Sequence, residues 1–191
     1  QETFGEFEQL SFSLVSPALA GQVLWQSASA LLAAMAAFFI YMLICFKANY
    51  RSVSAARFAI CSLVALVYVL LLVAGMLALL GQLTGLELDN FYAVIFWAVI
   101  LMSIFDIFIV FDQIRENLNR TAEQPFAELV DESVGQSIGR VLSTLVSALF
   151  FLVAIWLLGN AEIRFFVAIL GIGLVGSLFA SVCLATALLI D

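Results

Sequence analysis

The sequence predicts an all-α, polytopic membrane protein, built as a bundle of five transmembrane helices. Of its 191 residues, 65% are apolar and only 11% are charged. The mean hydropathy is +1.17, which is far more apolar than a soluble domain of this length. Five apolar runs are close to the length of about 20 residues that a helix needs to cross a hydrocarbon core about 30 Å thick. They lie near 27–46, 58–80, 91–111, 141–158 and 165–190.

Each predicted span has its own boundary signals. The first run ends before Lys47, and the second begins after Arg57. The third differs from the others because it carries Asp106 in its interior. The fourth begins after Arg140, and the fifth, which follows Arg164, is long enough to tilt or to bend at its glycines.

Basic residues predict the orientation, because cytoplasmic loops collect lysine and arginine. The second and fourth connections together hold only Arg164. The remaining basic residues flank the first and third connections: Lys47, Arg51, Arg57, Arg115, Arg120 and Arg140. We therefore expect the N-terminus outside and the C-terminus in the cytoplasm, with residues 1–22 as an external segment and residues 23–191 as the transmembrane domain.

Composition argues against several classes of function. The net charge of −7 comes partly from acidic residues on the predicted outer side, so no nucleic-acid partner is expected. Cys45, Cys61 and Cys183 lack the spacing of a zinc site or a disulfide framework. Without histidine the commonest catalytic base and metal ligand is missing, and no glycine-rich phosphate loop is evident. The sequence predicts neither an enzyme nor a bound cofactor.

Asp106 raises the main functional question. It lies about five residues, or roughly 8 Å at helical rise, inside the predicted membrane edge. Placing an acid in hydrocarbon costs roughly 2.5 to 3.5 kcal/mol on insertion scales. A side chain this short cannot reach the interface, so it needs a partner, a proton or water. An acid in this position indicates an ion path. The alternative is a structural hydrogen bond between helices.

A partner for Asp106 is expected on the fourth helix. Gln136, Arg140, Thr144 and Ser147 are spaced four, four and three apart, which makes a polar stripe running into the membrane. We expect Arg140 to reach the depth of Asp106 and to keep it ionised. Separation of the two helices would then favour uptake of a proton. The pair therefore predicts a proton-coupled switch.

The end of the third helix carries a second polar group. Asp112, Arg115 and Glu116 share one helix face just past the predicted membrane edge. A solvated helix end explains them as well as a functional role does, and the sequence leaves both open.

Two segments are predicted to be structural. In the last helix, small residues at four-residue spacing permit close helix approach: Gly173, Ser177 and Ser181. In the third connection, apolar residues fall on one helical face and acidic residues on the other, after Pro125 at the first turn. This pattern predicts a short helix near 125–138 on the cytoplasmic surface.

The run from Ser103 to Leu118, SIFDIFIVFDQIRENL, resembles the helix-end signature of SecF, the smaller partner in the SecDF protein-export complex. The typical form in that family is Ser-Ile-Asn-Asp-Thr followed by Val-Phe-Asp-Arg-Ile-Arg-Glu-Asn. The segment LVSPALAG, with Pro17 and Gly21, resembles the one that leads from the external domain of SecF into its second helix. Residues 136–147 are similar to the segment that bears the family's intramembrane arginine.

The resemblance implies the membrane half of SecF, within the wider RND-like group of proton-driven transporters. Asp106 and Arg140 match the acid and the arginine associated with proton-driven export, with the proton gradient as the energy source. The implied partners are a SecD-like subunit, the Sec channel, secreted preproteins and the lipid bilayer of a bacterial-type inner membrane. SecF proteins usually carry a first helix and an external domain before this region, so we expect the chain to correspond to their last five helices.

The signature departs from the family's form beside Asp106. The usual asparagine is Phe105, the usual threonine is Ile107, and the first arginine of the tail is Gln113. Tyr68 and Val69 stand where many relatives have His-Asp. A non-conducting scaffold for a SecD-like subunit or the channel is therefore a second hypothesis. A half-transporter for lipids or small molecules is a third.

Overall fold

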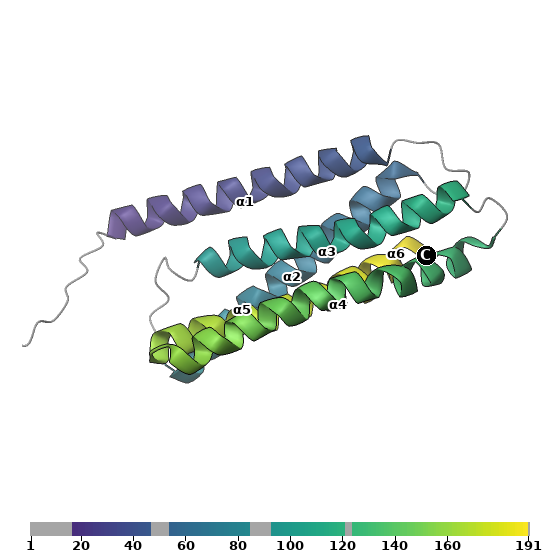
Figure 1. Cartoon of the computed structure of the whole chain (residues 1–191). Helices are drawn as coiled ribbons and strands as arrows, with labels where there is room; N and C mark the ends of the chain where they lie inside the picture. The colour runs from purple at the N-terminus through teal and green to yellow at the C-terminus, as the bar shows by residue number, and fades with distance from the viewer. Residues whose placement is uncertain (1–16, 47–53, 85–92, 121–123, 191) are drawn as a thin grey trace, which may run out of the picture.

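A computed structural model describes residues 17–46, 54–84, 93–120 and 124–190, and every regular element within these ranges is a helix (Figure 1). In chain order they are α1 (Pro17–Cys45), α2 (Ala55–Thr84), α3 (Ala93–Arg120), α4 (Phe126–Leu158), α5 (Ala161–Phe179), the π-helical segment η2 (Ala180–Leu184) and α6 (Ala185–Ile190). The last three follow one another without a break. Five helices, with these three counted once, are long and apolar enough to cross a membrane. The prediction of an all-α bundle with five spans is confirmed. Of the predicted external segment, residues 1–16 lie outside the described ranges, and α1 begins directly after them.

Local sequence explains where several helices begin. The two prolines of the chain, Pro17 and Pro125, stand at the starts of α1 and α4, where a fixed φ and a missing N–H are tolerated. Gly159 ends α4, and its N–H donates to the carbonyl of Ile155 at 2.8 Å. The side chain of Asn160 then accepts a hydrogen bond from a first-turn N–H of α5 at 3.0 Å, which is the usual role of an N-cap. This short turn makes α4 and α5 antiparallel neighbours.

The helix α4 differs from the sequence prediction. It is one helix of 33 residues, not a surface helix near 125–138 followed by a separate span at 141–158. At about 1.5 Å per residue it is about 50 Å long, more than the thickness of a hydrocarbon core of about 30 Å. The apolar face that suggested a surface helix packs inward, because Leu129 and Val130 are buried in the main core cluster. The prediction of a separate surface helix is therefore wrong. The same spacing of apolar residues is satisfied when that face of α4 packs into the core.

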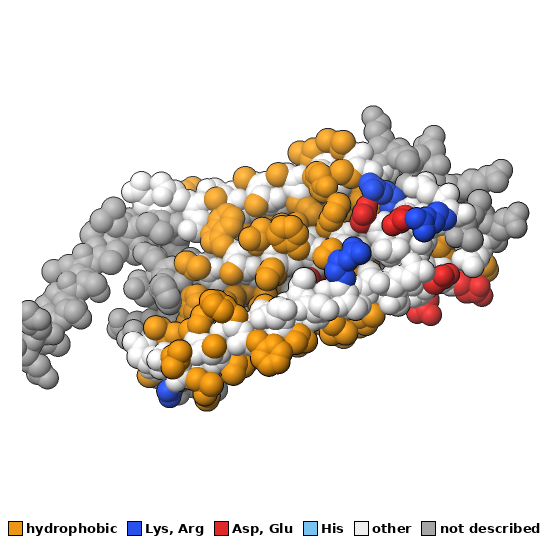
Figure 2. All heavy atoms as spheres, viewed as in Figure 1, with side chains coloured by type: hydrophobic (Ala, Val, Ile, Leu, Met, Phe, Trp, Pro, Cys, Tyr) orange, Lys and Arg blue, Asp and Glu red, His pale blue; other side chains and the backbone are white. Residues whose placement is uncertain are grey.

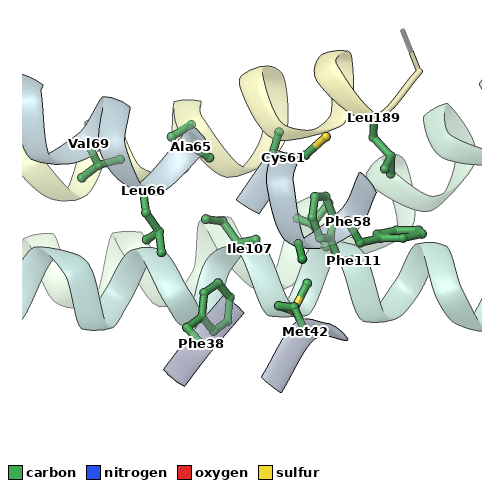
Figure 3. Close-up of a cluster of buried hydrophobic side chains, with 14 of the residues drawn as sticks. Phe38, Met42, Phe58, Cys61, Ala65, Leu66, Val69, Ile107, Phe111 and Leu189 are labelled. Atoms are coloured by element: carbon green, nitrogen blue, oxygen red, sulfur yellow. The ribbon is translucent and has the colours of Figure 1, made fainter. Parts of the chain in front are cut away.

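The helix α3 occupies the centre of the bundle. It packs against α2, α4 and α5, whereas α1 packs chiefly on α2 (Figure 1). Near one end, the Phe58 ring stacks on Phe46 with centroids 4.7 Å apart and meets Phe111 edge-on at 5.3 Å. Figure 3 shows this cluster, to which α1 contributes Met42 and α6 contributes Leu189. Lipid tails are as apolar as these side chains, so close packing, more than removal from water, stabilises the bundle.

The surface of the bundle is suited to lipid. Large apolar side chains such as Leu71, Phe150 and Leu158 are exposed, and apolar groups cover the middle of the molecule in Figure 2. Charged side chains gather toward one end, where α3 ends and α4 begins (Figure 2). We call this the charged end, and it is formed by Asp112, Arg115, Glu116, Arg120, Glu128, Asp131 and Glu132. This distribution, with the five spans, makes the chain a multi-pass membrane protein.

Gly173 lies where α5 comes closest to α2 and α3. A Cβ atom placed on it would lie 2.6 Å from a methyl group of Val99 and 3.2 Å from one of Val73. Real carbon atoms do not approach to the shorter of these distances, so any larger residue requires Val99 or the backbone to shift. Ser177 and Ser181 follow at four-residue steps on the same helix face and are buried. Small residues on this face let the helices approach one another closely.

Gly173→Val is expected to destabilise the bundle by about 1–3 kcal/mol, because the new side chain overpacks the junction of α2, α3 and α5. The measurement is the midpoint of unfolding when sodium dodecyl sulfate is titrated into the protein in mild detergent micelles. Gly75→Val on α2 is the matched control, since a Cβ at Gly75 meets nothing within 4 Å. Equal midpoints for the two variants would contradict the packing role of Gly173.

Candidate functional site

Asp106 lies in the middle of α3, where the residues on either side are apolar for a full turn or more except for Ser103. Its side chain is only 8% exposed. Residues of α3, α4 and α5 meet around it and line a cavity of about 10 Å³: Met102, Asp106, Thr144, Leu145, Ala148, Leu174 and Ser177. A cavity of this size has room for no more than about one water molecule. The carboxylate therefore sits at a tightly packed junction of three helices.

Ser177 of α5 is the hydrogen-bonding partner of Asp106. Its hydroxyl donates to Asp106 Oδ2 at 3.0 Å. Ser177 Oγ also lies 2.9 Å from the carbonyl oxygen of Leu174. Ser177 is 1% exposed. The four-residue spacing in the sequence indicated packing alone for this residue. A hydroxyl on a small-residue face was nevertheless a signal, because that face has to lie against a neighbouring helix.

Arg140 does not reach Asp106 in this structure. It lies one turn before Thr144 on α4, but its side chain is exposed, and no ion pair joins it to Asp106 within the described ranges. From the predicted polar stripe it is Thr144 that lines the cavity. Its hydroxyl donates to the carbonyl of Val141 at 2.8 Å. The structure thus brings Asp106 together with Ser177 and Thr144. Arg140 stays exposed, one helical turn before Thr144 on α4.

Arg115 links α3 to the end of α1. One of its nitrogens lies 2.6 Å from Asp112 Oδ1, in a geometry that makes an ion pair without a hydrogen bond to that oxygen. Another donates to the carbonyl of Cys45 at 3.4 Å, and the guanidinium lies 5.5 Å from the ring centroid of Phe46. A cation beside the last carbonyls of α1 complements the negative end of that helix. Arg115 and Asp112 therefore have a structural role at the charged end.

A polar clasp joins α3 to α4 nearby, and the sequence interpretation missed it. The side-chain amide of Asn117 donates to Ser133 Oγ at 2.8 Å and to Gln136 Oε1 at 3.0 Å. Gln113 donates to the same oxygen of Gln136 at 2.9 Å. Asn117 is buried, so these bonds satisfy groups that have little access to water. The signal was the four-residue spacing of Gln113 and Asn117, which puts both amides on one face of α3.

Neither a metal site nor a second buried carboxylate is found among the described residues. Among the described residues, no three histidine, cysteine, aspartate or glutamate side chains come together to hold a metal ion. A larger groove of about 670 Å³ lies between α2, α4 and α5, with Leu72, Leu152, Trp156 and Val175 in its lining. That lining is apolar, so it can only bind apolar groups. The buried carboxylate is the candidate functional site.

The chain as a whole is also similar to known proteins. A family model described as "Protein export membrane protein SecD/SecF, C-terminal" matches residues 1–191. The chain belongs to the SecD/SecF family. The resemblance predicted from the signature around Asp106 is confirmed. No solved structure matches the chain.

Curated members of the SecD/SecF family extend the comparison. The chain is 34% identical to protein translocase subunit SecF of Thermobaculum terrenum over 189 residues, which cover 98% of this chain and 58% of that protein. It is 29% identical to SecF of Synechocystis over 189 residues, again 98% of this chain and 58% of the relative. It is 30% identical to SecDF of Thermus thermophilus over 133 residues, 70% of this chain and 18% of that protein. The chain therefore spans 58% of the length of these two SecF relatives.

Asn117→Ala is expected to cost about 1–3 kcal/mol of stability, because it removes the two buried hydrogen bonds from Asn117 of α3 to Ser133 and Gln136 of α4. Unfolding by sodium dodecyl sulfate in detergent micelles measures the change. Glu116→Ala, one residue earlier, is the control, since Glu116 pairs with Arg120 at 2.7 Å on the exposed surface, where such pairs contribute little. If both variants unfold at the wild-type midpoint, the clasp does not stabilise the bundle.

Proposed function

We propose that the chain is the membrane region of a SecF-like subunit that uses the proton gradient to help move preproteins through the Sec channel. Family membership supports this proposal. The observation that carries it is Asp106, the only buried carboxylate among the described residues. A SecD-like membrane subunit is the proposed partner, which agrees with the name SecDF of the Thermus relative. The Sec channel and secreted preproteins are the further partners of the proposed assembly.

The geometry around Asp106 suits proton exchange better than it suits binding of a metal or a substrate. An ionised carboxylate offers about four lone-pair positions, and Ser177 donates to one of its oxygens. The cavity beside it is too small for a substrate. An unpaired charge in a membrane interior is costly, and a proton neutralises the carboxylate without any further ligand. Asp106 is therefore proposed to alternate between an ionised and a protonated form.

Arg140 is the second charged group of the proposed relay. Its exposed side chain starts one turn, or about 5 Å along the helix, from Thr144 at the cavity. A change of rotamer or a small shift of α4 would bring the guanidinium toward Asp106 and stabilise the ionised form. Withdrawal of Arg140 would favour the protonated form. In the proposal, an arrangement with Arg140 apart from Asp106, as in this structure, goes with the protonated form.

The proposed orientation follows from the basic residues. Arg57 lies in the first turn of α2, and Arg115, Arg120 and Arg140 lie at or near the charged end. Arg164 lies at the opposite end of the bundle, in the first turn of α5. Cytoplasmic segments collect basic residues, so the charged end is proposed to face the cytoplasm, with the N-terminus outside. The membrane would be a bacterial inner membrane, since the matched relatives are bacterial.

A non-conducting scaffold is the second candidate, because one contact favours it. The bond from Ser177 to Asp106 joins α5 to α3, and polar bonds between helices hold membrane bundles together. Phe105 and Ile107, on either side of Asp106, are apolar. In this case the carboxylate would hold helices together and would not exchange protons.

Asp106→Asn, in the full-length protein with its partner, is expected to remove the gradient-dependent part of preprotein export. The amide can still bond to Ser177, but it cannot take up a proton. The measurement is the rate of export into inverted membrane vesicles, with the gradient present or collapsed by an uncoupler. Asp131→Asn is the matched control, since Asp131 is exposed at the start of α4, and it is expected to export normally.

The same experiment separates the two candidate functions. Copurification of the partner subunit reports whether the Asp106→Asn complex is intact. Normal gradient-dependent export by an intact complex would favour the scaffold. Loss of the complex would make Asp106 a structural residue, and either result would contradict the proton role.

A further inference from the structure

The hydroxyl of Ser177 faces two acceptors with a single hydrogen. Its oxygen lies 3.0 Å from Asp106 Oδ2 and 2.9 Å from the carbonyl oxygen of Leu174. A serine hydroxyl carries one hydrogen to donate and two lone pairs that accept. Only one of the two contacts can therefore be a donated hydrogen bond at any moment. Rotation of the hydroxyl about one bond exchanges them.

This arrangement accommodates both protonation states of Asp106. When the carboxylate is ionised, Ser177 donates to it. When Asp106 carries a proton, its own O–H can donate to Ser177 Oγ, and the serine hydrogen turns to the carbonyl of Leu174. The heavy atoms keep their places in both states, and Asp106 Oδ2 and Ser177 Oγ stay hydrogen-bonded to each other in each of them.

We infer that Ser177 is a positioning residue that partners Asp106 in both protonation states, so that a proton can bind and leave without separation of α3 from α5. The inference rests on the proposed function, and it assigns to Ser177 a role beyond helix packing. With this role, the contact between Ser177 and Asp106 is compatible with both helix packing and proton exchange. The bond that holds the helices together is the same bond that lets the acid change its charge.

Few other ionisable side chains of the described helices lie near Asp106. On α3, the next ionisable side chain after Asp106 is Asp112, at the charged end. On α4, Arg140 is exposed and lies one turn from the cavity-lining Thr144. On α2, Tyr68 contacts the ring of Phe179 with centroids 6.2 Å apart. The stretch from α5 to α6 that follows Ser177 carries no ionisable side chain other than a cysteine. Among the residues lining the cavity, Thr144 donates to the carbonyl of Val141, and Ser177 donates to Asp106.

Ser181 provides a matched control within the same helix. It lies one turn after Ser177 and is fully buried. Its hydroxyl donates to the carbonyl of Leu178 at 3.0 Å, the same local bond that Ser177 can make to Leu174. Ser181 does not line the cavity of Asp106. Loss of either hydroxyl removes one oxygen from a tightly packed face, but only the loss at Ser177 removes a partner of Asp106.

The experiment is infrared difference spectroscopy of the full-length complex in lipid, recorded as the pH is changed. The carbonyl stretch of protonated Asp106 is identified as the band that Asp106→Asn removes. Ser177→Ala is expected to move this band to higher wavenumber, because the acid loses its hydrogen-bonding partner. Ser181→Ala is expected to leave it in place.

An unmoved band in Ser177→Ala, or an equal shift in Ser181→Ala, would overturn the inference. If Ser177→Ala fails to assemble, Ser177→Cys keeps a similar volume with a weak S–H donor. That variant is expected to give a smaller shift in the same direction, and an unmoved band would again overturn the role. Absence of any band that depends on Asp106 would show that the acid does not titrate, and would overturn both the inference and the proposed function. A shift in Ser177→Ala together with normal export in Asp106→Asn would refute the proposed function alone.

Discussion

A carboxylate held in the apolar interior of a membrane bundle is the constraint around which this structure is arranged. Asp106 sits in the middle of α3, the helix that contacts α2, α4 and α5. Its partner comes from α5, and α4 lines the small cavity beside it. Because an unpaired charge is costly in hydrocarbon, the proposed change of charge at Asp106 depends on how α4, which carries Arg140, lies against α3. That dependence is what would couple a proton to a movement of the bundle.

Two kinds of contact hold the helices around this acid. In the middle of the bundle, Gly173 lets α5 lie directly against Val73 and Val99, and packing at this distance replaces the hydrophobic driving force that lipid does not supply. At the charged end, Asn117 bonds α3 to α4 and Arg115 bonds α3 to the end of α1. The charged end therefore fixes the positions of three helices. At Asp106, about three turns before Asn117 along α3, the side-chain hydrogen bond described between helices is the one from Ser177.

The sequence predicts the spans well, because about 20 apolar residues in a row have few other places to fold. It fails where the same spacing of apolar residues fits two structures. In a short surface helix, Leu129 and Val130 would face the membrane surface. In the long helix α4 they are buried in the core of the bundle. Spacing along one helix also tells which residues share a face, but it does not tell which faces meet. For that reason the pairing of Asp106 with Ser177 was missed, and Arg140 was expected where Thr144 is found. The resemblance of the signature to SecF needed no such pairing, since it depends on residue order alone.

The claim that Asp106 exchanges a proton can be tested most directly by proton movement itself. The full-length complex would be reconstituted with the Sec channel in vesicles that contain a pH-sensitive dye, and an imposed gradient would be followed while a preprotein is being exported. Vesicles with the wild-type complex are predicted to lose the gradient faster during export than those with Asp106→Asn, at equal amounts of assembled complex. Equal rates of proton movement in the two preparations would contradict a proton-carrying role for this carboxylate.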